Sequence, residues 1–130
     1  MLNRTGITKE TGAAPVQILY NVQNQMSVSV LVSKAVKAEE VDGRKIVKAG
    51  TPLHGDLTNR ATAFTAAADG SATAVGVLLH DVDITNGDAN GSLLIWGFVN
   101  LDRVDETTAK LITETRQTEL AGKVWFLKDN

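Results

Sequence analysis

Alternating apolar and polar positions run through the first half of the chain. MSVSVLVS (Met26–Ser33) alternates Ser with Val, the period-two pattern of a half-buried strand. VQILYNV (Val16–Val22) is also β-like, since it mixes β-branched and aromatic residues. Asp42-Gly43 lies between two β-prone runs and predicts a hairpin turn. Pro52 lacks an N–H, so we expect it at the start or the edge of a strand.

Two later runs are apolar at consecutive rather than alternate positions. Ala74–Val82 and Ser92–Leu101 therefore predict strands that are covered on both faces. Ala61–Asp69 is rich in Ala and is followed by Gly70-Ser71, and we interpret it as strand and loop. The second half of the chain thus continues the β character of the first.

One helix is predicted near the C-terminus, over DETTAKLITETRQTEL (Asp105–Leu120). Asp105 is a candidate N-cap, Glu106 would lie near the positive end of the helix dipole, and Gly122 is a candidate stop. After the helix, KVWFLKDN predicts a short final strand. The residues that could supply the buried side of the helix are Leu101, Val104, Ala109, Leu111, Ile112 and Leu120.

Together these patterns predict a mainly β fold, a β-rich α+β class with one short helix near the C-terminus. We expect a compact arrangement resembling a sandwich or barrel, formed by a single domain over residues 16–130. Residues 1–15 are polar and lack periodicity. They are interpreted either as a frayed terminus or as an extended arm that becomes ordered when it binds a partner.

Composition narrows the possible functions. The chain has 130 residues, of which 43% are hydrophobic, so it can bury a core without disulfides. It has no Cys, which excludes thiol catalysis, iron–sulfur clusters and thiolate zinc sites. Its net charge of -2 offers no basic face, so no direct nucleic-acid partner is expected. No signal-like or membrane-spanning run is present, and a soluble protein of the cytoplasm is predicted.

The segment DVDITNGDANG (Asp81–Gly91) invites comparison with a calcium loop because of its Asp-x-Asp spacing. Asn86 stands where an EF-hand loop requires Gly, and Ser92 stands where it requires the closing Glu. Asp81, Asp83 and Asp88 could still form an irregular site. The Asn-Gly pairs at residues 86–87 and 90–91 favour the turn of a hairpin with a wide polar tip, which is the interpretation we adopt.

Candidate catalytic groups are few. His54 and His80 are the two histidines, and Asp81 follows His80 directly. Adjacent residues of a strand point to opposite faces, so Asp81 is poorly placed to orient His80 in a triad. No nucleophile elbow, Walker or dinucleotide motif occurs. We therefore expect no enzymatic activity, no cofactor and no metal.

Trp96, Phe98, Trp125 and Phe126 are the main aromatic residues, and we expect them in the core. A Trp on an outer face would instead anchor a contact with another subunit, since buried aromatic residues dominate interface energies.

The order of several segments resembles a known family. They are, in order, AGTPL (Ala49–Leu53), a Thr/Asn loop, an Ala-rich strand, DGSATAVGVLLHDVD (Asp69–Asp83), GFVNLDRVD (Gly97–Asp105), a helix and AGKVWFL (Ala121–Leu127). This order resembles the small capsid decoration proteins of tailed bacteriophages, including the lambda head-stabilising type. It is also similar to the head-fibre proteins of phages that infect Gram-positive bacteria. Residues 16–48 depart from the lambda type, because this region is longer.

The resemblance implies a trimer on the outer surface of the expanded head, assembled in the host cytoplasm, with the major capsid protein as partner. It also implies an N-terminal arm that pairs with capsid segments by strand addition. The candidate capsid-binding residues are Leu2, Asn3, Arg4, Thr5, Gly6, Ile7, Thr8, Lys9, Val16, Gln17, Ile18 and Tyr20. The candidate oligomer contact comprises Thr51, Pro52, Leu53, His54, Asn59 and Arg60.

The function that the resemblance implies is stabilisation of the phage head against the pressure of packaged DNA. A head-fibre base or a carbohydrate-binding virion adhesin is the alternative, and a small β-barrel enzyme or metal protein is the third hypothesis. An adhesin requires an exposed aromatic platform, which Trp96, Trp125 and Tyr20 could supply.

Overall fold

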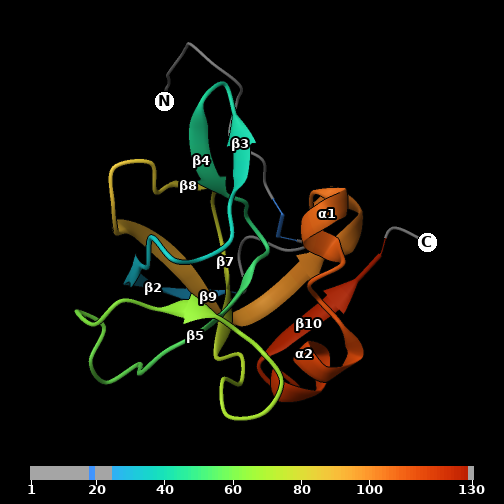
Figure 1. Cartoon of the computed structure of the whole chain (residues 1–130). Helices are drawn as coiled ribbons and strands as arrows, with labels where there is room; N and C mark the ends of the chain where they lie inside the picture. Colours follow the sequence, from blue (N-terminus) through green and yellow to red (C-terminus); the bar gives the residue numbers. More distant parts are fainter. Residues whose placement is uncertain (1–17, 20–24, 129–130) are drawn as a thin grey trace, which may run out of the picture.

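The structure, a computed structural model, describes residues 18–19 and 25–128 and consists mainly of β-strands (Figure 1). The β-rich class predicted from the sequence is confirmed, and the predicted arm over residues 1–15 lies outside the described residues. The elements are β2 (Met26–Val32), β3 (Glu39–Val41), β4 (Arg44–Val47), β5 (Pro52–His54), β6 (Thr65–Ala66), β7 (Gly76–Leu78), β8 (Val82–Asp83), β9 (Ala89–Asn100), a 3₁₀ helix (Leu101–Arg103), α1 (Glu106–Ala109), α2 (Glu114–Glu119) and β10 (Val124–Leu127).

The long strand β9 organises the larger sheet, whose order is β10-β9-β7-β5-β6, with β2 also paired to β9. Leu94 of β9 is the partner of both Ser27 in β2 and Val77 in β7, so these two strands lie on opposite edges of β9. β10 joins β9 in parallel, beyond the part that β2 covers. A second sheet, β3-β4-β8, projects at the top of Figure 1.

The strand predicted at Met26–Ser33 and the hairpin predicted around Asp42-Gly43 are confirmed, whereas of Val16–Val22 only Ile18 and Leu19 are described and Leu19 forms an isolated bridge with Val99. In β2, Val30 and Val32 are buried, whereas Ser29 is exposed. Asp42 and Gly43 have φ angles of 53° and 79°, the two positive values of a type I′ turn, and join β3 to β4. Pro52 is the first residue of β5, where its missing N–H disrupts no earlier pairing.

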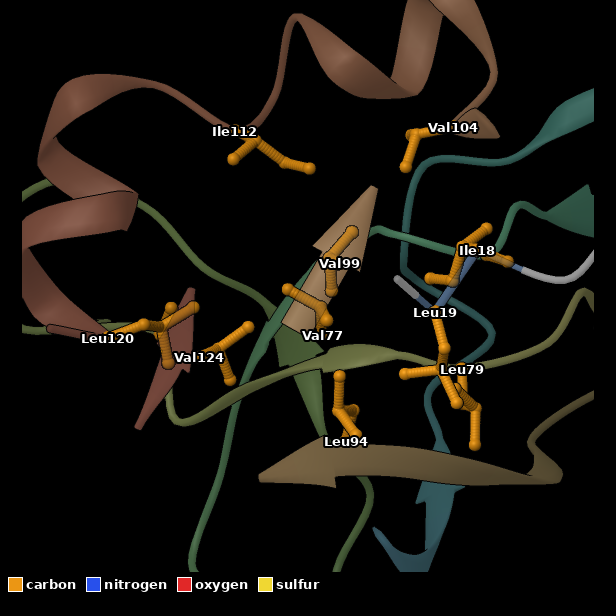
Figure 2. Close-up of a cluster of buried hydrophobic side chains, with 12 residues drawn as sticks. Ile18, Leu19, Val77, Leu79, Leu94, Val99, Val104, Ile112, Leu120 and Val124 are labelled. Atoms are coloured by element: carbon orange, nitrogen blue, oxygen red, sulfur yellow. The ribbon is translucent and has the colours of Figure 1, made fainter. Parts of the chain in front are cut away.

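Two buried clusters lie on opposite sides of the β7–β9 pair. Val77 and Leu94 belong to the first cluster, which Figure 2 shows. Their neighbours Leu78 and Leu93 belong to the second. Successive strand residues point to opposite faces, so a strand between two cores must be apolar at every position. The prediction of strands covered on both faces is confirmed for this part of the two runs.

The face of β9 that points toward the core changes partway along the strand. Leu94 and Val99 both belong to the first cluster, although they stand an odd number of positions apart and a regular strand would point them to opposite faces. β9 carries a bulge here, because Met26 and Ser27 of β2 pair with Trp96 and Leu94 and Ile95 is skipped, and Gly97 has a φ of 155°, a conformation that favours glycine. Because of this change, Trp96 points away from the core.

The predicted helical region near the C-terminus is confirmed, but two short helices, α1 and α2, replace the single continuous helix expected over Asp105–Leu120. Asp105 caps α1 as expected, with its Oδ2 accepting from the N–H of Thr108 at 3.4 Å. Thr113 then adopts an extended conformation and caps α2, its Oγ1 accepting from the N–H of Arg116 at 3.3 Å. This second cap ends the helical run and starts a new one.

The break between α1 and α2 also changes which side chains are buried. Ile112 and Leu120 reach the first cluster, whereas Leu111 is 46% exposed, contrary to prediction. Residues 111 and 112 lie in the turn between the two helices, which brings Ile112 to the cluster and leaves Leu111 at the surface. Gly122 has a φ of 81° and lies in the turn before β10, as expected for a residue that ends a helix.

The polar segment after β7 is not a simple hairpin tip. Val82 and Asp83 form β8, which pairs with β4 in the smaller sheet. Gly87 has a φ of 130°, so the turn predicted at Asn86-Gly87 is confirmed. The segment therefore links the two sheets before the chain returns along β9.

The turn predicted at Asn90-Gly91 is wrong, because both residues lie within β9 and pair with β2. At this position glycine is needed because a side chain would not fit, and not because the backbone has a positive φ. A Cβ at Gly91 would lie 2.7 Å from Cγ2 of Val82 and 3.1 Å from Cδ1 of Leu78. The backbone of β9 thus passes close to side chains of the second cluster.

Candidate interaction surface

The predicted capsid-binding residues are placed only at the base of the arm. Ile18 is buried in the first cluster, and its carbonyl accepts from the N–H of Asn100 at 2.8 Å. Ile18 therefore joins the base of the arm to the end of β9. The other members lie outside the described residues: Leu2, Asn3, Arg4, Thr5, Gly6, Ile7, Thr8, Lys9, Val16, Gln17 and Tyr20.

The predicted oligomer contact is divided between the core and the surface. Its buried members, whose side chains pack inside this chain, are Thr51, Pro52 and Leu53. His54 is half-buried, with Nδ1 2.8 Å from the carbonyl oxygen of Thr73. Asn59 and Arg60 are exposed, and the Arg60 guanidinium donates to the carbonyl of Ser29 at 3.0 Å. The contact itself stays a prediction.

The carboxylates of the polar segment point to separate neighbours. Asp81 accepts from the N–H of Ala49 (2.8 Å), Asp83 pairs with Arg44 (2.6 Å), and Asp88 accepts from the N–H of Lys34 (2.7 Å). Hydrogen bonds from Thr85, followed by that from Arg44, lower the pKa of Asp83 to about 2. Within the described part of the chain, no three His, Cys, Asp or Glu side chains are grouped to hold a metal ion.

Glu39 and Asp105 form an acidic pair beside Lys48. Oε2 of Glu39 is buried and has no donor, and two ionised carboxylates cannot share a hydrogen bond. The bond to Asp105, followed by burial, therefore raises the pKa of Glu39. The same bond lowers the pKa of Asp105, whose carboxylate also caps α1. This pair thus fastens β3 to the first turn of α1.

An exposed apolar surface covers the junction of β2, β9 and β10, and we call it the aromatic face. Its exposed members are Met26, Trp96, Trp125 and Leu127, with exposed fractions of 58%, 41%, 37% and 38%. Phe98 is half-buried among them. The expectation of a core position is therefore wrong for the two tryptophans, whereas Phe126 packs against the first cluster.

The three aromatic rings of this face contact one another. Phe98 and Trp125 are strand partners and stack, with ring centroids 5.0 Å apart and planes 20° apart. Trp96 meets both rings edge-on, at 6.2 Å from Phe98 and 6.1 Å from Trp125. Each such pair contributes about 0.5–1.5 kcal/mol beyond burial. The cluster is therefore pre-organised, yet it leaves much of its apolar surface in water.

Strand register brings these residues together from three distant parts of the sequence. Met26 is the partner of Trp96 across β2 and β9, and Trp125 is the partner of Phe98 across β10 and β9. Leu127 follows Trp125 by two positions and so lies on the same face of β10. A contiguous exposed apolar surface formed by several large side chains often marks a site where the protein binds another molecule.

The sequence contained a partial signal for this face. Trp96 and Phe98 alternate with Gly97 and Val99, and Trp125 alternates with Val124 in the same way. Period-two spacing of aromatic residues indicates that they share one side of a strand. It does not indicate which side is covered, because that depends on the bend in β9.

Comparison with protein-family models gives no match, and comparison with curated proteins gives none either. In the described part of the chain, no helix is long and apolar enough to cross a membrane. The candidate site therefore rests on the geometry of the aromatic face itself.

Proposed function

We propose that this chain is a capsid decoration protein of a tailed bacteriophage. In this role it binds the outside of the expanded head at capsomer junctions as a trimer and stabilises the shell against packaged DNA. The observation that carries the proposal is the aromatic face, since exposed Trp residues on a rigid sheet are typical anchors of protein interfaces. The segment order that resembles decoration proteins supplies the class of partner, the major capsid protein.

The proposed mechanism depends on linked contacts. A trimer that touches three capsomers dissociates only when all its contacts break together. Linking raises the overall affinity by about 10²- to 10⁴-fold without any new interaction. If the docking points match only the expanded lattice, binding also stabilises that lattice by mass action.

Cryo-EM of the purified protein with undecorated, expanded heads tests the proposal. We expect density at the capsomer junctions for the unaltered chain. The double variant Trp96→Ser with Trp125→Ser should lose at least about tenfold in head affinity, because both anchors are removed. Leu57→Ser is the control, since Leu57 has a similar exposed fraction of 38% and lies outside the aromatic face.

Bare heads at saturating protein would reject the decoration role. Equal binding by the double variant and the control would reject the aromatic face as its anchor. A head-fibre base would also bind heads, and additional density extending from the bound protein would distinguish it.

The exposed tryptophans favour one second candidate, a carbohydrate-binding virion adhesin. Their ring planes lie 87° apart, so Trp96 and Trp125 do not form one flat platform for successive sugar rings. This geometry favours a protein partner over an extended glycan. Saturation-transfer NMR with host-cell saccharides separates the two candidates, since transfer to the sugars is expected only for an adhesin.

A further inference from the structure

β10 forms an edge of the larger sheet, next to the aromatic face. Among the described residues it pairs with β9 alone. The carbonyl of Lys123 accepts from the N–H of Gly97 at 3.0 Å. Backbone groups alternate in direction along a strand, so those of Trp125 turn toward β9 and those of Phe126 turn outward. With respect to residues 18–19 and 25–128, the edge of the sheet is therefore open at Phe126.

The helical turn before β10 provides an acceptor for the first backbone N–H that points away from β9 along this edge. The N–H of Val124 donates to the carbonyl of Leu120 at 2.9 Å, at the end of α2. The open part of the edge therefore begins after this N–H and continues to Lys128. Figure 1 shows this end of β10 pointing away from α2. An open edge beside exposed apolar side chains is a template for an added strand.

The charges at the two ends of β10 disfavour a second copy of the chain as the added strand. Lys123 and Lys128 flank the strand, are exposed, and form no ion pair with another described residue. Antiparallel pairing of two β10 strands would place Lys123 of one copy near Lys128 of the other. Like charges facing each other across strands are destabilising, and edge lysines are a common guard against self-pairing.

The same charges disfavour the chain's own N-terminal residues. Residues 1–15 contain Arg4 and Lys9 but a single acidic residue, Glu10. Their positive balance does not complement two flanking lysines. Charge complementarity therefore indicates a strand from a different protein with acidic residues at both ends.

The area of the aromatic face fits a short strand. Its exposed side chains offer roughly 400 Å², given that an aromatic side chain can bury about 150–250 Å². A standard protein interface needs about 800 Å² per partner. A few extended residues beside β10 can cover the exposed side chains of Trp125 and Leu127, and their backbone would gain hydrogen bonds at Phe126.

We propose that the open edge of β10 binds an extended segment of a partner protein by strand addition. This segment carries apolar residues at alternate positions, which lie on the aromatic face, and acidic residues that meet Lys123 and Lys128. The inference rests on the proposed function, because it describes how the aromatic face engages its partner. Asp102 and Glu106 line the same hollow as Lys128, so Lys123 carries the larger part of the charge preference.

NMR titration of the full chain with synthetic peptides tests this inference. The probes are Asp-Thr-Val-Thr-Val-Thr-Asp, the same peptide with Lys at both ends, and an acid-flanked peptide with a central Pro. We expect the first to shift the amide signals of Phe126 and Lys128 and to bind about tenfold more tightly than the Lys-flanked peptide. The Pro peptide should bind weakly, because it lacks a ladder donor.

Charge reversal provides the decisive variant. Lys123→Glu with Lys128→Glu should reverse the preference toward the Lys-flanked peptide. Lys34→Glu with Lys37→Glu is the matched control, since both lysines are exposed and lie outside β10. The control should keep the original preference.

Equal affinity for both peptides, no saturable shifts at millimolar peptide, or an unchanged preference in the Lys123/Lys128 variant would overturn strand addition. Co-sedimentation with heads distinguishes this failure from that of the proposed function. Head binding without the peptide preference rejects strand addition alone. The peptide preference without head binding supports strand addition and rejects the capsid as partner.

Discussion

Arg116 shows how single residues hold distant segments together. Its side chain is only 5% exposed, and its guanidinium donates to Glu119 at 2.8 Å and to Asp69. Glu119 in turn accepts from the N–H of Ala74 at 2.8 Å. The network joins α2 to the loop before β7, and each buried charge depends on its partner.

Arg116→Ala should lower the free energy of unfolding by about 3–5 kcal/mol, because it leaves the largely buried Glu119 carboxylate without its cation. Urea denaturation measures the change. Arg44→Ala, which breaks the exposed pair with Asp83, should cost much less than Arg116→Ala, because solvent screens an exposed ion pair. Similar losses in the two variants would show that burial does not determine the contribution of Arg116.

Asp83 predicts a pH dependence in the acid range. Its folded-state pKa of about 2 lies below the ordinary value, so its stabilising contribution is present above about pH 4. The contribution is lost as pH falls through about 2. Asp83→Asn should therefore be less stable than the unaltered protein near neutral pH, and the two should converge in strong acid. Urea unfolding at several pH values tests this, and a constant difference across the range would contradict it.

At the scale of elements, caps and close contacts decide where helices and strands end. Thr113 interrupts a run with helical periodicity because its hydroxyl accepts from the second helix. Gly91 continues β9 where a turn was expected, because the strand passes close to Val82. Average helix and strand propensities of the residues would not predict either of these boundaries.

Thr113→Ala should lower the free energy of unfolding by about 1 kcal/mol through loss of the α2 cap. Thr115→Ala is the control, since Thr115 is exposed inside the same helix and Ala has the higher helix propensity. Thermal and urea unfolding should show a loss for the first variant and none for the second. Equal effects would mean that the Thr113 hydroxyl does not cap the helix.

Gly91→Ala should lower the free energy of unfolding by about 1–3 kcal/mol, since the new methyl group overlaps Cγ2 of Val82. Asn90→Ala, at the exposed neighbouring position, should change it by less than about 0.5 kcal/mol. An unaltered stability for Gly91→Ala would show that the two sheets can separate at this point without cost.

Local signals predicted the elements that depend on neighbouring residues. Asp42-Gly43 gave the hairpin turn, and the Ser/Val alternation gave β2, because turn chemistry and strand period are local. The exposure of Trp96 could not be predicted in this way. It depends on the bend in β9 and on β2 and β10 meeting there, which are contacts between residues far apart in sequence.

At the scale of the whole molecule, the base of the arm and the aromatic face are both fixed to β9. Ile18 bonds to Asn100 at the end of that strand, and Trp96 lies earlier along it. Among the described residues, the members of the two buried clusters begin at Ile18. The arm can therefore be tested separately from the fold.

The deletion of residues 1–15 should leave a folded protein with much weaker head binding, because the resemblance to decoration proteins implies that the arm is a second capsid contact beside the aromatic face. Thermal melting measures the fold, and co-sedimentation with expanded heads measures binding. Undiminished binding would show that the arm is not a second capsid contact and would leave the aromatic face as the main contact.

The aromatic face also determines where the tryptophan fluorescence of the protein originates. The chain contains two tryptophans, and both lie on this face. Selectively excited indole fluorescence therefore originates entirely from this one surface. Any partner that covers it should shift the emission to the blue, so the unlabelled protein is an intrinsic optical reporter of its own occupancy.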